Sequence, residues 1–352
     1  MKLLTSIMNA IPPVENADLS HAIRRRADSL TKPLGSLGRL EEVMLQYGLA
    51  RGKATAKIGR KAIFVFCADH GIAREGVSAY PPEVTAQMVS NFLGGGAAIS
   101  VLCRQYGIEA RIVDAGVDAD LSGAPGLIHR KVARGTASFL HAPAMVEKQA
   151  FEALDVGIEL AVAAAREGFD ILGAGEMGIG NTTAAAALIA AFTGRDAADV
   201  AGLGTGIAAE RLVHKADVVR RAITLHAAAL HSPLSTLAAV GGFEIASIAG
   251  LMLGAASERL PVVVDGVISS AAALAAVKLC PAVLPYLFFS HQSTEPGHAV
   301  LLDHLGVRPL LHLELHLGEG SGAALGIAVI ESAMRLYNEM ATFESAAVSR
   351  TS

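Results

Sequence analysis

Short, continuous apolar runs recur along the chain from residue 61 onwards, and stretches with helical periodicity separate them. The apolar runs lie at 62–67, 110–116, 170–173, 261–266, 283–289 and 309–315. Helical spacing covers 83–106, 146–167, 181–193, 207–228, 242–257, 267–279, 297–305 and 321–341. A strand that is apolar throughout is typical of a sheet covered by helices on both faces. The alternation therefore predicts an α/β fold with a doubly wound, mostly parallel sheet.

The first 60 residues follow a different pattern. Helical spacing covers 17–30 and 39–51, and a loop with proline and glycine separates the two stretches. The first stretch carries Arg24, Arg25 and Arg26 on a basic face. Such a face is most often solvated, and contact with a phosphate or a partner subunit is the alternative. The pattern predicts a helix–loop–helix ahead of the sheet.

Composition narrows the class of protein. The 352 residues suffice for one large domain with an appendage, or for two domains. Hydrophobic residues make up 52% and charged residues 18%, which is typical of a globular chain with a large core. The net charge of −4 and the lack of a basic block argue against nucleic acid as a partner. The most apolar helical stretches, 236–257 and 267–280, contain Glu244 and Lys278, so they predict buried helices rather than membrane spans.

The N-terminus and the cysteines bear on the compartment. The first 20 residues contain no sustained apolar segment and no typical cleavage site, so secretion is not indicated. Cys67, Cys103 and Cys280 are odd in number and far apart. This usage favours reduced thiols in a cytoplasmic protein over a disulfide framework or a zinc site.

Polar and glycine residues gather directly after the apolar runs. In an open parallel sheet, ligands bind outside the carboxyl ends of the strands, so these residues are expected to meet in one place. The residues concerned are Asp69, His70, 173–181, Asp265, Ser290, His291 and 318–322. Their convergence is a stronger argument for a site than any single motif.

The stretch 175–183 (GEMGIGNTT) follows a predicted strand and opens a predicted helix. It nearly matches a P-loop, but Asn181 stands where the lysine belongs, which argues against an NTPase. The amides of Gly178 and Gly180, with Thr182, remain a suitable cradle for a single phosphate. The alternative is a tight strand–helix turn in which Asn181 is the helix cap.

Gly202, Gly204 and Gly206 form a second glycine-rich turn before a helix. Beside the first turn, it suggests two backbone surfaces around one anionic ligand. Lys215 on the following helix is a candidate cation for that ligand, although a lone helical lysine is usually solvated.

The segment 76–83 is a loop that leads into a helix. Tyr80, with the prolines beside it and Ser78 before it, offers a flat apolar wall for an aromatic ring. Gln87 lies one turn into the helix and would hydrogen-bond at the edge of that ring. The alternative is an ordinary helix that begins at proline.

The stretch 310–326 passes from a predicted strand straight into glycines around a single carboxylate, Glu319. A catalytic residue and a helix cap are equally compatible with that pattern alone. Within the strand, His312, Glu314 and His316 alternate and would share one face. They form a candidate metal triad, and a metal-dependent hydrolase is therefore the alternative function. A non-catalytic nucleotide-binding module is a further alternative.

Several of these motifs together resemble one known family. The stretches are 30–40, 67–72, 77–81, 175–183, 290–298 and 317–323. In this order they are similar to nicotinate-nucleotide–dimethylbenzimidazole phosphoribosyltransferases, and the resemblance spans about residues 20 to 340. It implies a homodimer with a Rossmann-like catalytic domain at 61–326. A small helical domain would combine 1–60 with 327–352, whose last residues, 342–352, carry no matching motif.

The resemblance also implies the reaction and its residues. Phosphoribose would pass from nicotinate mononucleotide to 5,6-dimethylbenzimidazole, giving α-ribazole 5′-phosphate and nicotinate, without a cofactor. Glu319 matches the family's general base, and Glu176 and Lys215 match positions that line its pocket. The substrate-binding set implied by these motifs is Ser78, Tyr80, Gln87, Met177, Gly178, Gly180, Asn181, Thr182, Gly204, Gly206, Lys215, Ser290, Leu317, Gly318 and Gly320.

The chemistry of this reaction suits these residues. The donor carries a monophosphate and a cationic pyridinium leaving group, so the reaction requires no metal. It requires alignment of two flat rings and a group that takes up the N–H proton of the acceptor. A helix start lowers the pKa of a carboxylate such as Glu319, whereas a closed apolar pocket raises it. We expect burial to decide.

Overall fold

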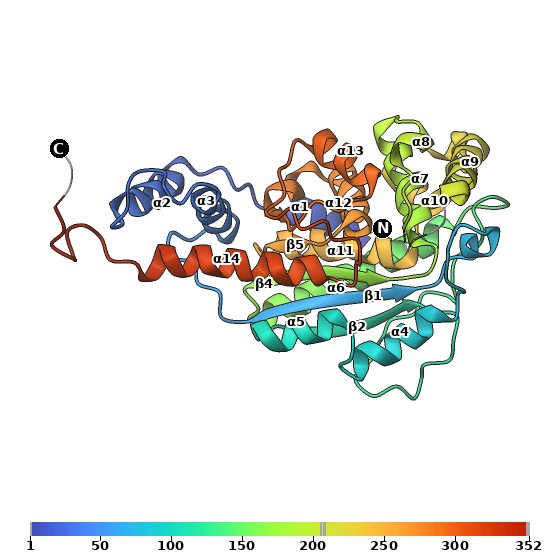
Figure 1. The fold of residues 1–352 in the computed structure, drawn as a ribbon, viewed down its shortest axis with the longest axis horizontal. Coiled ribbons are helices and arrows are strands. Elements are labelled where there is room, and N and C mark those ends of the chain that lie inside the picture. The colour runs from blue at the N-terminus through green and yellow to red at the C-terminus, as the bar shows by residue number, and fades with distance from the viewer. Residues whose placement is uncertain (1, 205, 207–208, 350–352) are drawn as a thin grey trace.

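The computed structural model describes residues 2–204, 206 and 209–349. Its centre is a sheet of six strands in the order β3-β2-β1-β4-β5-β6, in which every neighbouring pair is parallel (Figure 1). The strands are β1 (Lys61–Ala68), β2 (Glu109–Gly116), β3 (Ile128–His129), β4 (Ile171–Met177), β5 (Val262–Val264) and β6 (Leu287–Phe289). The predicted doubly wound sheet is confirmed. Its strand order reverses between β1 and β4, which is where such sheets bind ligands.

Helices cover both faces of the sheet. The faces follow from β1, whose eight residues are all buried. Phe64 and Phe66 belong to the core under α6 (Glu147–Arg166) and α11 (Phe243–Ser257). Their neighbours in β1 belong to a second core under α5 (Ala98–Tyr106) and α14 (Ser321–Glu339). Because alternate side chains point to opposite faces, an unbroken apolar run is required here.

The remaining helices lie in these two layers or at the two ends of the molecule. They are α1 (Lys2–Ala10), α2 (Ala17–Ser29), α3 (Arg39–Arg51), α4 (Val84–Leu93), α7 (Asn181–Thr193), α8 (Ala197–Val200), α9 (Ala209–Leu225), α10 (Pro233–Val240), α12 (Val267–Leu279) and α13 (Pro296–Leu305), with 3-10 turns at Gly71–Glu75, Ala227–Ala229 and Pro281–Tyr286. Residues 207 and 208 of the predicted helix 207–228 lie outside the described residues.

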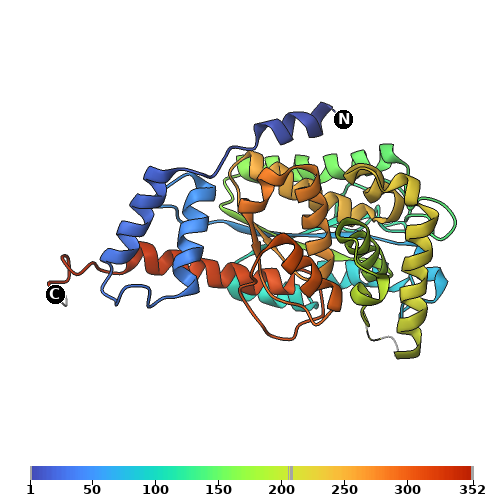
Figure 2. The same ribbon diagram turned by 90° about the horizontal axis from the view of Figure 1, so that it is seen from above.

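At one end of the molecule α2 and α3 pack together, and α3 packs on α14, so segments from early and late in the sequence lie side by side there (Figure 2). Arg26 donates to the carbonyl of Met340 at 3.0 Å, and Leu30 forms a bridge with Thr342. Helix α1 instead packs on α6 and α11. The domain division at 1–60 plus 327–352 stays a prediction. Of the predicted tail, 350–352 lie outside the described residues.

The stretch Val84–Tyr106 has the length and composition of a membrane span. The single helix predicted at 83–106 is wrong, because three glycines at 94–96 divide it into α4 and α5. These helices contain 10 and 9 residues. A span requires about 20 residues, so neither helix crosses a bilayer.

The strand predicted at 309–315 is also wrong. Only Leu311 forms a bridge, to His291, and Glu314 has a positive φ of 56°. Beyond Leu311 the segment has no neighbouring strand among the described residues, so the alternating pattern produces no ladder. His312, Glu314 and His316 therefore share no strand face and are exposed. Within the described part of the chain, no group of three or more His, Cys, Asp or Glu is arranged to hold a metal. The metal triad is rejected.

The run predicted at 283–289 is a strand only in its second half. The first half forms the 3-10 turn Pro281–Tyr286, which contains Pro285. Proline lacks the N–H that a central strand requires, so pairing begins only at Leu287.

Candidate active site

The turn between β4 and α7 is built from Gly178 to Gly180, and α7 begins at Asn181. The Asn181 side chain donates a hydrogen bond to the Glu176 carboxyl. Helix α7 has no side-chain cap, so the interpretation of Asn181 as a cap is wrong. The amides of Asn181 and Thr183 donate to the carbonyls of Gly178 and Gly180, which leaves the amide of Thr182 at the helix start for an anion.

Lys215 joins the two glycine turns. Its side chain is 0% exposed, and its Nζ atom donates to Thr182 Oγ1 and to the carbonyl of Gly202, both at 2.9 Å. Burial lowers the pKa of Lys215 to about 8. The alternative of a solvated lysine is wrong. Beside it, the amide of Gly204 donates to Glu295 at 2.8 Å, so this turn already holds a carboxylate.

Glu176 lies at the end of β4 and is buried. Burial raises its pKa to about 8, and the negative charges of Glu244 and Asp265 act in the same direction. The hydrogen bond from Asn181 opposes this shift. Below pH 8 the carboxyl is therefore mainly protonated in the free enzyme, so it carries no full negative charge toward a developing cation at neutral pH.

Glu319 lies in a strained turn before α14. Gly318, Glu319 and Gly320 have φ values of 83°, 65° and 89°, a left-handed region that costs a residue with a side chain about 1 kcal/mol. A glycine in β4 allows the close approach, since a Cβ on Gly175 would lie 2.5 Å from the amide of Gly320. Strain of this kind is concentrated at functional sites.

The cap of α14 is Asp265 rather than Glu319. Asp265 follows β5 and accepts hydrogen bonds from the amides of Gly320 and Ala323, both at 3.0 Å. Burial raises its pKa, whereas the nearby His291 and the helix amides favour its ionised form. The interpretation of Glu319 as the cap is therefore wrong for α14.

The Glu319 carboxyl points instead toward the start of α5. The backbone N–H of Ile99 donates to it, and its Oε2 atom is buried without a hydrogen-bond partner. Burial and the charge of Asp265 raise the pKa of Glu319, and the bond from Ile99 lowers it less. Burial outweighs the helix start, as expected, so the carboxyl is a stronger base than an exposed glutamate.

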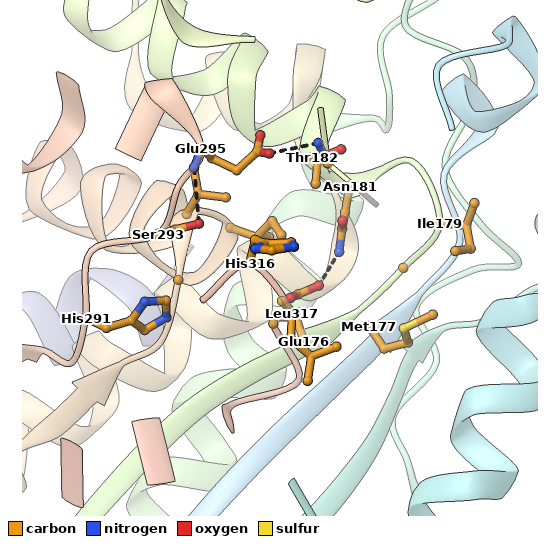
Figure 3. A pocket seen from close by; sticks show the side chains of 16 residues that line it. Glu176, Met177, Ile179, Asn181, Thr182, His291, Ser293, Glu295, His316 and Leu317 are labelled. Atoms are coloured by element: carbon orange, nitrogen blue, oxygen red, sulfur yellow. Dashed lines mark hydrogen bonds between the residues drawn. The ribbon is translucent and has the colours of Figure 1, made fainter. Parts of the chain in front are cut away.

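One cavity of about 610 Å³, open solvent at its mouth included, lies over the carboxyl ends of β4 and β5 (Figure 3). Its lining is Glu176, Met177, Gly178, Ile179, Asn181, Thr182, Gly204, Gly266, Val267, Ile268, His291, Ser293, Glu295, His316, Leu317 and Gly318. Eight of the predicted site residues are among them: Glu176, Met177, Gly178, Asn181, Thr182, Gly204, Leu317 and Gly318.

The remaining predicted residues lie around this cavity. Lys215 lies behind Thr182, and Ser290 is buried and donates to the carbonyl of Asp265 at 3.1 Å. Glu319, Gly320 and Gly180 lie in the two turns without lining the cavity, and Gly206 is exposed. Thr205, beside it, lies outside the described residues.

Ser78, Tyr80 and Gln87 do not line this cavity; Tyr80 is 52% exposed and Gln87 is exposed. Their segment nevertheless adjoins the first glycine turn, because the amide of Ile179 donates to Thr85 Oγ1 at 3.1 Å. The role of these three residues as an acceptor wall stays a prediction.

Three polar residues of the cavity, His291, Ser293 and Glu295, are not in the substrate-binding set that the motifs imply. All three belong to the polar loop after the apolar run 283–289, of which that set contains only Ser290, although His291 is among the residues expected to converge there. Asp265 was noted at a strand end without a role. The available signal was the same for all of them: a polar side chain directly after a buried strand.

The fold places a cavity lined by polar and glycine residues at the carboxyl ends of a doubly wound parallel sheet, which is where Rossmann-like proteins bind their ligands. Residues 11–348 match a family model described as phosphoribosyltransferase. The enzyme named nicotinate-nucleotide–dimethylbenzimidazole phosphoribosyltransferase from Pelodictyon phaeoclathratiforme is 52% identical over 99% of this chain and 98% of its own. Its namesake from Geobacter sulfurreducens is also 52% identical, over 99% of each chain.

Solved structures agree with these sequence relatives. The crystal structure of CobT from Thermus thermophilus superimposes with a TM-score of 0.91 and 46% identity, covering 95% of this chain and 100% of its own. The chain belongs to the nicotinate-nucleotide–dimethylbenzimidazole phosphoribosyltransferase family, as the motifs indicated.

Proposed function

We propose that the chain transfers phosphoribose from nicotinate mononucleotide to 5,6-dimethylbenzimidazole, giving α-ribazole 5′-phosphate and nicotinate, a step in the synthesis of the lower ligand of cobalamin. The observation that carries this function is the buried Lys215, which joins two glycine turns beside a cavity that also contains Glu176. Within this family and fold, that arrangement suits a monophosphate on a ribose.

The donor phosphate would bind where the two glycine turns meet. The amide of Thr182 at the start of α7 and the ammonium of Lys215 would supply donors and positive charge there. The carboxylate of Glu295, which accepts from Gly204 in the free enzyme, supports this placement because it shows that the turn accepts an oxyanion. The phosphate would displace or share that contact.

The acceptor ring would enter between α4 and the Glu319 turn. Met177 packs in the same core as residues of α4 and α5, and Glu319 Oε2 is unpartnered beside α5. Tyr80, Gln87 and Ser78 lie on the exposed side of this entry. In the reaction, the C1′–N bond to nicotinate breaks with its electrons on the pyridine nitrogen. The acceptor nitrogen that carries a free lone pair forms the new bond from the opposite face, and the N–H proton of the other ring nitrogen passes to Glu319.

We further propose a cytoplasmic homodimer, by analogy with the family. Residues 1–60 and 327–352 would together form a small helical domain. The packing of α2 and α3 on α14 supports this division, whereas α1 lies on the catalytic part.

The decisive test of the function is a coupled measurement of both products. The purified protein, nicotinate mononucleotide and dimethylbenzimidazole are expected to give nicotinate and an α-riboside phosphate in equal amounts. Omission of either substrate should abolish the second product. Tight binding of the nucleotide with no release of nicotinate would instead indicate a non-catalytic nucleotide-binding module.

The pKa of Glu176 predicts a pH dependence. Because burial raises that pKa to about 8, the group ionises as the pH rises through 8. An ionised Glu176 stabilises positive charge on the ribose, so kcat/KM for the donor should increase over this range. Glu176→Gln should remove that limb and lower kcat/KM by about 10-fold or more at pH 8. A limb that survives in the variant would assign it to another group.

A further inference from the structure

His291 occupies a slot that Gly322 leaves open. It follows β6, and its side chain is 3% exposed. A Cβ on Gly266 would lie 3.5 Å from its Nε2 atom, and a Cβ on Gly322 would collide with its ring. The ring of His298 packs edge-on against it, with centroids 6.2 Å apart. The imidazole is therefore held in one place by the shape of its surroundings.

Asp265 lies beside one ring nitrogen of His291. Its Oδ1 atom lies 3.8 Å from His291 Nε2, which is an electrostatic contact and not a hydrogen bond, and the backbone amides of Gly320 and Ala323 hold the carboxylate in position. The negative charge favours the neutral tautomer with the proton on Nε2 and the lone pair on Nδ1. The Nδ1 atom is buried and has no hydrogen-bond partner. A buried acceptor without a hydrogen-bond donor costs free energy, so a bound ligand that donates to this atom would be stabilised.

The position of His291 in the cavity indicates which group of the ligand would donate a hydrogen bond to it. Figure 3 shows His291 and Ser293 on one side of the cavity and Met177 and Ile179 on the other. His291 thus lies away from the acceptor wall and in the same cavity as Thr182 and Gly204 of the phosphate cradle. At neutral pH, the carboxylate, pyridinium ring and ionised phosphate of nicotinate mononucleotide have no strong hydrogen-bond donor. Its ribose hydroxyls are the groups that donate.

We propose that His291 Nδ1 accepts a hydrogen bond from a ribose hydroxyl of the donor nucleotide, with the charge of Asp265 favouring the tautomer that leaves Nδ1 free to accept. This inference rests on the proposed function, since it uses the donor named there. The contact orients C1′ between the leaving ring and the acceptor. His291 is accordingly a substrate-binding residue specific for the sugar, and it takes no proton from the acceptor.

The test compares nicotinate mononucleotide with its 2′-deoxy and 3′-deoxy analogues. In the wild-type enzyme, loss of the relevant hydroxyl should lower kcat/KM by about 10-fold. His291→Leu should show the same loss with the natural donor and no additional loss with that analogue. His291→Asn, which retains an acceptor near the position of Nδ1, should recover part of the activity. KM for dimethylbenzimidazole should not change in either variant.

Two results would overturn the proposal. One is an equal penalty of His291→Leu on the natural donor and on both deoxy analogues, which would indicate a purely structural role. The other is a penalty that vanishes with nicotinamide mononucleotide, which would assign the contact to the nicotinate carboxylate. Calorimetric binding of the natural and deoxy donors to the wild type gives the same comparison without turnover. A wild type that binds the donor without turnover contradicts the proposed function but leaves this comparison intact.

Discussion

Glu319→Gln is expected to fold normally and to lose at least about 100-fold in kcat, the loss typical for removal of a general base. The glutamine keeps the size of the side chain and an oxygen that accepts from Ile99. It cannot take up the N–H proton of the acceptor. The start of α14 should be unaffected, because Asp265 caps that helix. The measurement is kcat with both substrates saturating, together with the midpoint of thermal unfolding.

A matched control separates the loss of the general base from any effect of a substitution at a strained backbone position. Glu314 also has a positive φ, of 56°, but its side chain is exposed. Glu314→Gln should therefore leave kcat and the unfolding midpoint unchanged. KM for nicotinate mononucleotide should change little in Glu319→Gln, because Glu319 does not line the cavity that holds the phosphate cradle. Turnover close to that of the wild type in Glu319→Gln would remove Glu319 from the mechanism.

The sheet was predictable because burial on both faces leaves a signal in single strands. All eight residues of β1 are buried, so its apolar run identifies a central strand without knowledge of its partners. The segment after Leu311 shows the limit of such patterns. Leucine alternates there with His312, Glu314 and His316, yet no strand of the described chain lies alongside it. Alternation predicts a strand only where a partner exists, and partners are a property of the whole fold.

The site was predictable where backbone geometry requires a residue type. Glycines at 318 and 320 have positive φ, and Gly178 leaves room for the carbonyl of Ala68. Glycine spacing therefore located both turns. The roles of Asp265 and His291 depend on which elements lie side by side, since their partners come from the distant α14 and the turn before it. No local pattern contains that information.

The protonation states of the two glutamates follow from burial. The sequence alone shows only that burial and a helix start shift the pKa of Glu319 in opposite directions. Glu319 has a raised pKa because burial exceeds the effect of one backbone amide. Glu176 has a pKa of about 8 because Glu244 and Asp265 add their charges to burial. Glu244 belongs to α11, and the sequence shows only that this helix is apolar and not which residues lie near it. Its proximity to Glu176 emerges from the packing of α11 against β4.

Lys215→Met is expected to raise KM for nicotinate mononucleotide by about 10- to 100-fold, the range for loss of one charged hydrogen-bond donor. The variant has a side chain of similar length, which can remain between Thr182 and Gly202. The donor phosphate then loses the ammonium that joins the two glycine turns. KM for dimethylbenzimidazole should remain unchanged. Lys148→Met, at an 85% exposed side chain on α6, is the control.

The pKa of Lys215 allows a second, independent test through the pH dependence of kcat/KM. Burial lowers that pKa to about 8, so the ammonium loses its proton as the pH rises through 8. In the wild type, kcat/KM for the donor should fall by about 10-fold per pH unit above that value. Together with the rising limb assigned to Glu176, the profile should be bell-shaped with its maximum near pH 8. Lys215→Met should remove only the alkaline limb.

A donor without phosphate separates the charge of Lys215 from its packing. With nicotinate riboside, the wild type and Lys215→Met should differ by less than about 3-fold, because no phosphate is present to lose its partner. An equal loss on the riboside and the nucleotide would mean that the substitution disturbs the turns. An unchanged KM for the nucleotide would place the phosphate elsewhere. The predicted result, a penalty confined to the phosphorylated donor, would assign the cradle between the two glycine turns to the phosphate.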